Sequence, residues 1–299
     1  MSRRHLLMLA GLAALWGASF MFIKVAVRDL TPITLVGLRF ALGALTLLPI
    51  VLASPGARQT LAQLRAAVVP LVVTGLFNSA VPILALSWAE KRIDSGLAAE
   101  IQAAAPLFAA LLAIRFSREE RVTGGRLVGL LVGFGGVALL VGSQPRGAVL
   151  AALAVAFSAL CYAGAALYAG RRLQGVPPLV TAFGTLVAAT LVTLPPGLAE
   201  LPTRLPGWKV DASVLTLGIA GTGIGYVLYY GLIAGAGASR SILITYLVPA
   251  VALAYGALLL GEPVTAAALG GLALVLGGVA LGTGALRWRR TRPAPQVGG

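Results

Sequence analysis

Ten long apolar runs constrain what this chain can fold into more than any other feature of its sequence. Each run has about 20 residues, the length that an α-helix needs to cross a hydrocarbon layer of roughly 30 Å. Strands of a membrane β-barrel would show alternation over about 10 residues instead. The sequence therefore predicts an all-α integral membrane protein with ten transmembrane helices, over residues 6–26, 33–53, 66–88, 95–114, 124–142, 148–170, 178–198, 212–234, 239–260 and 265–286.

Composition and charge agree with this fold class and indicate an orientation. Only 11% of the 299 residues are charged, against roughly 25% in a soluble domain. The net charge of +14 permits a nucleic-acid partner, but the positions of the charges argue against one. With the N-terminus in the cytoplasm, fifteen of the 23 lysines and arginines fall in inner segments and seven in outer ones, which is the positive-inside bias. We therefore expect a bacterial-type cytoplasmic (inner) membrane protein, embedded in lipid, with both termini in the cytoplasm and no nucleic-acid partner.

The second half of the chain repeats the first. The octapeptide GGVALLVG at 135–142 recurs as GGVALGTG at 277–284. Other pairs match at similar offsets: Glu120 with Glu262, Pro106 with Pro249, Pro32 with Pro178, and Trp16 with Tyr162. The sequence therefore predicts two copies of one five-helix unit, at 1–144 and 145–287, followed by a disordered basic tail at 288–299.

The odd number of helices in each copy determines the predicted topology. The second copy must begin on the other side of the membrane, so the two copies run in inverted orientation. The charges agree, because the loop RFSREERVTGGR after the fourth helix is basic, whereas its counterpart GEPVTAAALGG has no Lys or Arg. Many secondary transporters have inverted repeats and rock one repeat-derived unit against the other around a midplane site. The alternative is a duplication that produced only a stable bundle.

Several motifs give the chain a family resemblance over nearly its whole length. They are WG-x-x-F in the first helix (Trp16, Gly17, Phe20), LRF in the second (38–40), a mid-helix proline in the fourth and ninth, Gly261-Glu262, and a glycine-rich final helix. The order of these motifs, and their repetition in both halves, resemble the drug/metabolite transporter superfamily, EamA branch. Within that branch the chain is similar to the YddG-type exporters of amino acids and related metabolites. The resemblance implies small-molecule export and leaves the substrate open. One departure is Arg118-Glu119-Glu120, where Gly-Glu is usual.

Prolines near the middle of two repeat-related helices are candidate hinges. Pro106 and Pro249 each remove an N–H and clash with the carbonyl four residues earlier, which frees the backbone oxygens of Gln102 and Thr245. Gln102 and Thr245 are themselves polar and correspond in the two repeats, so we expect these kinks to line or gate a pathway. The alternative is a permanent kink satisfied by a neighbouring helix. Pro82 is a weaker candidate, because its counterpart is a glycine.

Aromatic residues at mid-depth are candidates for a binding cavity. They lie too deep for an interfacial belt, and buried tyrosine hydroxyls need partners. The predicted cavity residues are Trp16, Phe20, Phe77, Tyr162, Tyr226, Tyr230 and Tyr246, together with the polar residues Asn78, Ser79, Gln102 and Thr245. Such a cavity would favour neutral or zwitterionic organic solutes. Ordinary core packing is the alternative for any single ring.

Two charged residues lie inside predicted spans, where a charge costs at least about 2.5–3.5 kcal/mol at the helix centre. Arg39 lies in the second span and Glu100 in the fourth. Their depths, roughly 10 and 8 Å at about 1.5 Å per residue, predict a hydrogen-bonded pair. One interpretation is a fixed clasp between two helices. In the other, Glu100 titrates or meets the ammonium group of a substrate, and Arg39 meets its carboxylate.

These features predict a secondary transporter that exports amino acids, aromatic and neutral ones included, and related metabolites by alternating access. We expect uniport, because Glu100 is the sole carboxylate in the predicted spans and lies off-centre; the alternative is a proton-coupled multidrug or cationic-drug exporter. An intramembrane enzyme is disfavoured, because no predicted span contains the Asp or His that such chemistry needs. With one histidine (His5) and one cysteine (Cys161), we expect no metal and no cofactor. Ten helices can enclose a pathway without an oligomeric partner.

Overall fold

The computed structural model describes residues 2–116, 124–241 and 243–282, and every element within these segments is helical. The all-α prediction is therefore confirmed for the described residues. The predicted tail at 288–299 and the residues Arg118 to Glu120 lie outside them.

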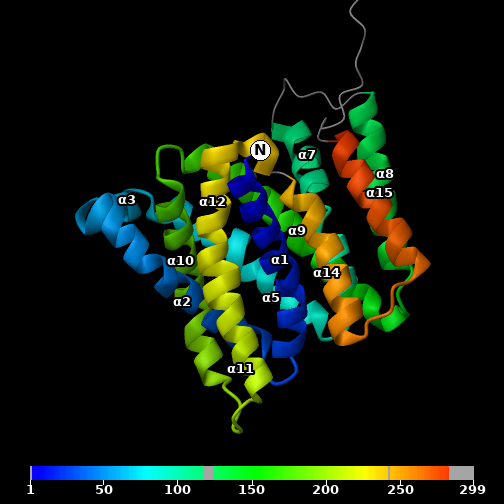
Figure 1. Cartoon of the computed structure of the whole chain (residues 1–299), viewed down its shortest axis with the longest axis horizontal. Helices are drawn as coiled ribbons and strands as arrows, with labels where there is room; N and C mark the ends of the chain where they lie inside the picture. Colours follow the sequence, from blue (N-terminus) through cyan, green and yellow to red (C-terminus); the bar gives the residue numbers. More distant parts are fainter. Residues whose placement is uncertain (1, 117–123, 242, 283–299) are drawn as a thin grey trace, which may run out of the picture.

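The first half of the chain comprises ten helical elements, some of which join into longer rods (Figure 1). Two of them, η1 and η2, are short π-helical segments. The elements are α1 (Arg3–Ala26), α2 (Pro32–Val51), η1 (Leu52–Gly56), α3 (Ala57–Ala66), α4 (Val68–Gly75), η2 (Leu76–Ala80), α5 (Val81–Glu90), α6 (Ser95–Gln102), α7 (Ala105–Phe116) and α8 (Gly125–Gly142).

The second half contains a further π-helical segment, η3, in the middle of one of its rods. Its elements are α9 (Arg146–Arg172), α10 (Pro178–Ala199), α11 (Trp208–Leu215), η3 (Thr216–Ile224), α12 (Gly225–Ala236), α13 (Ala238–Ser241), α14 (Ile244–Leu260) and α15 (Ala266–Gly282). Both η2 and η3 interrupt otherwise α-helical rods at mid-length.

Eight rods are long and apolar enough to cross a membrane: Arg3–Ala26, Pro32–Val51, Val68–Glu90, Ser95–Ala113, Gly125–Gly142, Arg146–Arg172, Pro178–Ala199 and Trp208–Ala236. Two further apolar helices, α14 and α15, are shorter, with 17 residues each. The described structure is thus a bundle of apolar helices with eight clear candidate spans, as an integral membrane protein requires.

The sequence explains where several of these helices begin and end. Helix α2 starts with Pro32, whose fixed φ suits a first helical position, and the Thr31 hydroxyl caps it by accepting a hydrogen bond from the Thr34 N–H at 3.4 Å. Helix α14 ends at Gly261, which adopts a left-handed conformation with φ +69°. Glycine takes this conformation without steric penalty, so the chain can turn there toward α15.

Glycines bring α8 and α15 into backbone contact. A Cβ on Gly278 would collide with the backbone of Gly133, and a Cβ on Gly129 would collide with the backbone N of Gly282. Small residues at such positions let two helix backbones approach closely, which helps drive association where lipid removes the hydrophobic driving force between helices. The two helices lie side by side at one edge of the bundle (Figure 1).

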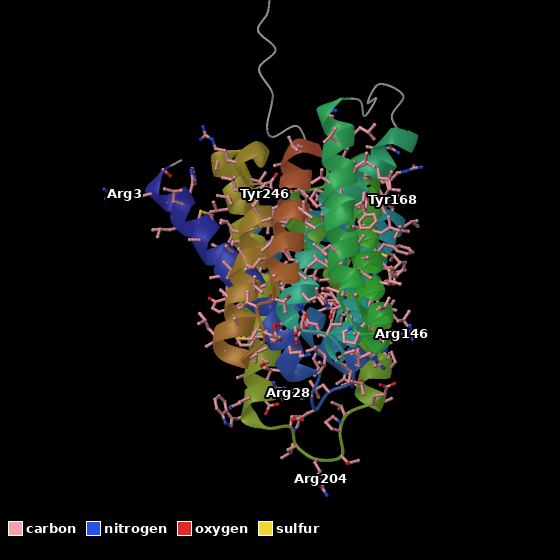
Figure 2. The ribbon with its side chains drawn as sticks, turned by 90° about the vertical axis from the view of Figure 1, so that its right-hand side faces the viewer. Arg3, Arg28, Arg146, Tyr168, Arg204 and Tyr246 are labelled. Atoms are coloured by element: carbon pink, nitrogen blue, oxygen red, sulfur yellow. The ribbon has the colours of Figure 1, made fainter. Side chains whose placement is uncertain are left out.

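The ends of the bundle are marked by charged residues (Figure 2). Arg3 and Tyr168 lie toward one end, and Arg28, Arg146 and Arg204 lie at the other. Helices α1 and α9 therefore run in opposite directions. Below, the two ends are called the Arg3 end and the Arg28 end.

The glycine contact generates a matched prediction. Gly278→Ala should destabilise the protein by about 1–3 kcal/mol, because the added methyl group overpacks against the α8 backbone. Gly277→Ala adds the same methyl group where nothing lies within 4 Å, and it should be neutral or slightly stabilising because alanine favours a helix over glycine. Unfolding in detergent, followed by circular dichroism, measures both. Equal midpoints for the two variants would contradict the assigned α8–α15 contact.

Candidate functional site

A cavity of about 510 Å³ lies between the helices. Residues of both halves of the chain line it, from α1, α2, α4, η2 and α5 on one side of the sequence and from α9, α10, η3, α12 and α14 on the other. Its lining includes residues close to helix ends at the Arg3 end of the bundle. They are Ala169, next to Tyr168 near the end of α9, Thr181 near the start of α10, and Ile244 and Thr245 at the start of α14. The cavity therefore extends from mid-depth toward the Arg3 end.

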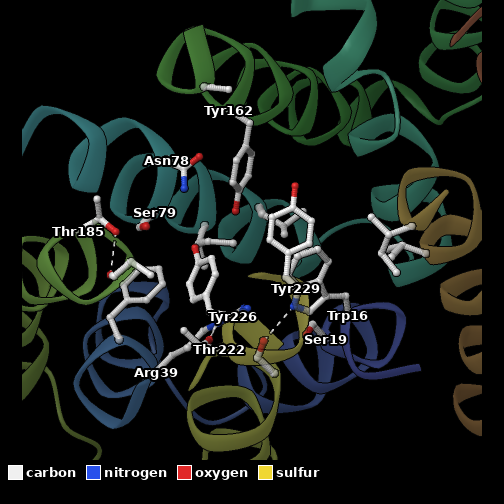
Figure 3. Close-up of a pocket in the computed structure, with 18 of the residues that line it drawn as sticks. Trp16, Ser19, Arg39, Asn78, Ser79, Tyr162, Thr185, Thr222, Tyr226 and Tyr229 are labelled. Carbon is white, nitrogen blue, oxygen red and sulfur yellow. Dashed lines mark hydrogen bonds between the residues drawn. The ribbon is translucent and has the colours of Figure 1, made fainter. Parts of the chain in front are cut away.

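Four aromatic rings form a continuous series along the cavity (Figure 3). The Trp16 ring lies 5.2 Å from that of Tyr229, and Tyr229 lies 5.4 Å from Tyr230. Tyr230 stacks on Tyr226, with centroids 6.0 Å apart and planes at 14°. Such offset and tilted contacts are the favoured geometries of aromatic pairs. The series presents a wall of ring faces and phenol groups to whatever occupies the cavity.

Trp16, in the first half of the chain, bonds to the second half, which carries the three tyrosines of this wall. Its indole Nε1–H donates a hydrogen bond of 3.0 Å to the Gly221 carbonyl in η3 (Figure 3). The π-helical turn of η3 alters the regular carbonyl ladder, and such segments are frequent at functional sites. Gly225 provides room for the indole, because a Cβ there would lie 2.8 Å from Nε1.

Arg39 is the only charged residue among the described residues that line the cavity. Its side chain is 8% exposed, and its Nε–H donates a hydrogen bond of 3.0 Å to the Thr222 hydroxyl, which itself donates to the Leu217 carbonyl at 2.8 Å. The Arg39 Nη1 atom is buried and has no hydrogen-bond partner in the described part of the chain. A guanidinium group thus lies at the cavity with unused donors.

Hydroxyl and amide groups complete the lining. Asn78 and Ser79 enter from η2, and Tyr162 faces them from α9 with its hydroxyl directed into the cavity (Figure 3). Ser19 and Thr185 also line it, but their hydroxyls bond to carbonyls of their own helices at 3.0 and 2.9 Å. The arrangement can bind a small organic molecule that has an apolar or aromatic body and a few polar groups.

The structure brings together most of the cavity residues predicted from the sequence. Eight of them line the cavity: Trp16, Phe20, Asn78, Ser79, Tyr162, Tyr226, Tyr230 and Thr245. The other three, Phe77, Gln102 and Tyr246, are absent from the lining. Phe77 is 46% exposed. The Gln102 Oε1 and Tyr246 hydroxyl atoms are buried without hydrogen-bond partners among the described residues.

The predicted hinge prolines lie outside the cavity lining. Pro106 follows a break in the chain's helical path, because α6 ends at Gln102 and α7 begins at Ala105. Pro249 lies inside α14, which continues as one helix around it. Pro82 lies at the start of α5, directly after η2. The regular α-helix is therefore interrupted next to Pro106 and Pro82, whereas it continues through Pro249.

The predicted pair between Arg39 and Glu100 is not formed in this structure. Arg39 bonds to Thr222, and both carboxylate oxygens of Glu100 are buried without a hydrogen-bond partner among the described residues. Depth in the membrane, on which the prediction rested, does not give the position of a helix around the bundle. Helix α2 packs mainly against α10 and η3, whereas α6 packs mainly against α14 and α9.

Some cavity residues were missing from the predicted set. Thr222 is one of them, although it corresponds to Ser79 in the other repeat, which is a usable signal. Tyr229, which the sequence places at mid-depth beside Tyr226 and Tyr230, also lines the cavity. Thr74 and Thr185 gave no signal, because a hydroxyl inside an apolar run commonly bonds to its own helix.

At the Arg28 end, Glu262 ties the loop after α14 to the start of α6. Its carboxylate accepts hydrogen bonds from the Ser95 N–H at 2.8 Å, the Ser95 hydroxyl at 2.8 Å and the Gly96 N–H at 3.1 Å. Asp94 holds the N-cap position of α6 without making a capping hydrogen bond, so Glu262 supplies the cap from a distant part of the chain. An anion is favoured there by the exposed N–H groups and the helix dipole. We call this contact the Glu262 cap.

Lys24 strengthens the same end. Its Nζ donates hydrogen bonds to the backbone carbonyls of Glu90 at 2.8 Å and Ile93 at 2.6 Å, which joins the end of α1 to the connection between α5 and α6. Burial, and then the negative charge of Glu262, raise the pKa of Asp94, whereas Lys24 lowers it. Part-buried polar contacts thus join helices at the Arg28 end, while the cavity reaches toward the Arg3 end.

A bundle of apolar helices around an aromatic and hydroxyl-lined cavity, extended toward one end and held together at the other, has the construction of a membrane transporter. Comparison with known proteins agrees. The EamA-like transporter family matches residues 3–142 and 149–283. The chain belongs to this family and is a multi-pass membrane protein.

Individual relatives and a solved structure extend the comparison. A protein from Archaeoglobus fulgidus named an uncharacterized transporter is 30% identical over 91% of this chain and 96% of its own length. A protein from Salmonella typhimurium named a probable amino-acid metabolite efflux pump is 28% identical over 97% of this chain and 98% of its own. A solved crystal structure matches with a TM-score of 0.65 at 22% identity, covering 96% of this chain and 100% of that one, which supports the fold.

The Trp16 contacts generate a prediction about the cavity wall. Trp16→Ala removes the hydrogen bond to Gly221 and the contact with Tyr229. It should destabilise the protein by about 3 kcal/mol, the lower end of the range for Trp→Ala, because the ring is half-buried. It should also speed amide hydrogen exchange in η3. Phe77→Ala, which truncates an exposed ring in the neighbouring rod, should leave η3 exchange unchanged. Mass-spectrometric hydrogen exchange measures both, and an unaltered η3 in Trp16→Ala would contradict the attachment.

Proposed function

We propose that the protein exports amino acids, including aromatic and neutral ones, and related small metabolites across the cytoplasmic membrane. It does so as a uniporter by alternating access, with ten transmembrane helices arranged as two inverted five-helix repeats and with both termini in the cytoplasm. The central cavity binds the solute, and the protein performs no chemistry on it. The single observation that carries the proposal is the cavity, which both halves of the chain line and which reaches toward the Arg3 end.

The packing of the helices supports the inverted repeat. If each helix is replaced by its repeat counterpart, the main contacts map onto one another: α1 with α14 onto α9 with α6 and α7, and α2 with η3 onto α10 with α4 and η2. The contacts of α2 with α10 and of α8 with α15 map onto themselves. The family also matches the two halves separately. The opposite directions of α1 and α9 in Figure 2 agree with this arrangement.

Helices α14 and α15 complete the ten spans in this proposal. Each has 17 residues and is about 26 Å long at 1.5 Å per residue, close to the roughly 30 Å hydrocarbon thickness. In Figure 1 the C-terminal end of α15 lies toward the same end of the bundle as the start of α1. An even number of spans places both termini on one side, as the positive-inside bias predicts.

The substrate class follows from the cavity and one relative. Ring faces, phenol groups and the Asn78 amide suit an organic solute of amino-acid size, and the Salmonella typhimurium relative is named a probable amino-acid metabolite efflux pump. The Arg39 guanidinium repels cations, which argues against cationic drugs as the main substrates.

The proposal is tested by reconstitution into liposomes with a panel of labelled amino acids. Uptake should follow the solute gradient and be insensitive to an imposed pH gradient. Glu100→Gln should preserve both the rate and this insensitivity, because glutamine keeps the shape of the side chain without a titratable group. The control variant is Trp208→Ala, which removes an exposed ring at the Arg28 end and leaves the cavity lining unchanged. Uptake of cationic dyes alone, driven by the pH gradient and lost in Glu100→Gln, would establish the proton-coupled drug exporter instead.

Alternating access requires the Glu262 cap to break when the Arg28 end opens. Loss of a cap typically costs about 0.5–2 kcal/mol, so Glu262→Ala should raise the population open at this end about 2- to 30-fold. A cysteine at Ser19, in a Cys161→Ala background, reports this opening through its alkylation by an impermeant maleimide added from the Arg28 side.

The matched control for this measurement is Glu200→Ala, which removes an exposed carboxylate at the same end. It should leave the labelling rate of the Ser19→Cys protein unchanged. If Glu262→Ala labels no faster than this control, the cap does not hold the end closed.

A further inference from the structure

We propose that Arg39 is the residue that binds the carboxylate of the transported solute, so that the substrates are amino acids and other organic acids with an apolar or aromatic body. This inference rests on the proposed function of the same cavity and specifies the chemistry of its ligand. It places the anionic end of the solute beside η3 and the body of the solute along the aromatic wall.

The guanidinium group has donors left over. It carries five N–H groups, of which Nε–H bonds to Thr222, while Nη1 is buried and has no partner among the described residues. An unpaired buried charge is costly and persists only where something compensates it. A carboxylate accepts from a guanidinium in a forked, two-bond geometry, and it would satisfy the donors that this structure leaves open.

The protein's own carboxylates do not occupy this position. Glu90 interacts electrostatically with Arg39, but it lies on α5 outside the cavity lining, and both of its oxygens lack hydrogen-bond partners among the described residues. It also faces the positive charge of Lys24 and the negative charge of Glu262. Glu90 therefore offsets part of the charge of Arg39 from outside the cavity lining and does not occupy the place of a ligand.

The surroundings of Arg39 fit the rest of an amino acid. Tyr226 and Tyr162 lie close enough to interact electrostatically with the guanidinium, and Tyr226 begins the series of rings that runs through Tyr230 and Tyr229 (Figure 3). A ring face attracts an ammonium group by a cation–π interaction, and the same wall packs an apolar side chain. A solute that is only cationic lacks the anchor and is repelled by it.

Two pairs of ligands isolate the contribution of the carboxylate to binding, because in each pair one member has a carboxylate and the other has an amide in its place. They are L-phenylalanine with L-phenylalaninamide, and 3-phenylpropanoate with 3-phenylpropanamide. Each is titrated against the full-length protein in detergent, and the rise in its unfolding midpoint gives an apparent Kd. Because a hydrogen bond to a charged group is worth about 1.5–3 kcal/mol, each acid should bind about 10- to 150-fold more tightly than its amide.

Substitutions at Arg39 assign this preference to the side chain. Arg39→Gln should bring the acid-to-amide ratio close to one, while Arg39→Lys should keep a reduced preference because an ammonium group retains the charge without the fork. Arg146→Gln removes the same charge from an exposed position and should leave the ratio unchanged. The ratio compares two ligands on one protein, so a general loss of stability does not alter it.

The outcomes distinguish this inference from the proposed function. An acid-to-amide ratio near one in the unsubstituted protein, or no stabilisation by either acid at saturating concentration, overturns the inference even if Arg39→Gln does not fold. A ratio retained in Arg39→Gln overturns it as well. Selective binding of the acids without their uptake into liposomes would leave the inference standing and refute the export function. Equal uptake of acids and amides would refute the inference and leave the export function standing.

Discussion

The absence of water in the hydrocarbon layer is the constraint on which the rest of this structure depends. In that medium each backbone N–H and C=O must find its partner within the protein, which leaves helices as the building elements of an α-type membrane protein. All described elements are helical. Irregular backbone at membrane depth is tolerated where it borders a cavity or protein, and η2 and η3, which carry Asn78 and Thr222, both line the cavity.

Several polar contacts of the site join the two halves of the chain. Trp16 and Arg39 of the first half bond to Gly221 and Thr222 in η3 of the second. At the Arg28 end, Glu262 of the second half caps α6 of the first. The glycine contact of α8 with α15 also crosses the halves, but it is a backbone packing contact at the edge of the bundle.

The sequence predicted the fold class and several of the aromatic and polar residues of the cavity, for physical reasons that apply generally in membranes. Uninterrupted apolar runs have few alternatives to spanning helices, and rings or amides at mid-depth are uncommon enough to indicate a cavity, as Trp16, Tyr162 and Asn78 show. Phe77, although it lies next to Asn78 in η2, is 46% exposed and absent from the lining, because depth alone does not tell which way a side chain points. The Arg39–Glu100 pair failed because depth carries no information about the order of helices around the bundle. The Glu262 cap was not predicted, since it joins residues 95 and 262 through tertiary packing.

The central claim is that two inverted repeats rock about one cavity, and inter-spin distances measured across both ends of the bundle test it most directly. Label pairs at Arg92 and Val264 report the Arg28 end, and pairs at Gln174 and Arg240 report the Arg3 end, in a Cys161→Ala background and in lipid. The account predicts two distance populations at each end, with the long population at one end growing as the long population at the other declines when substrate is added. Distances that stay fixed at both ends, or that lengthen together, would contradict it.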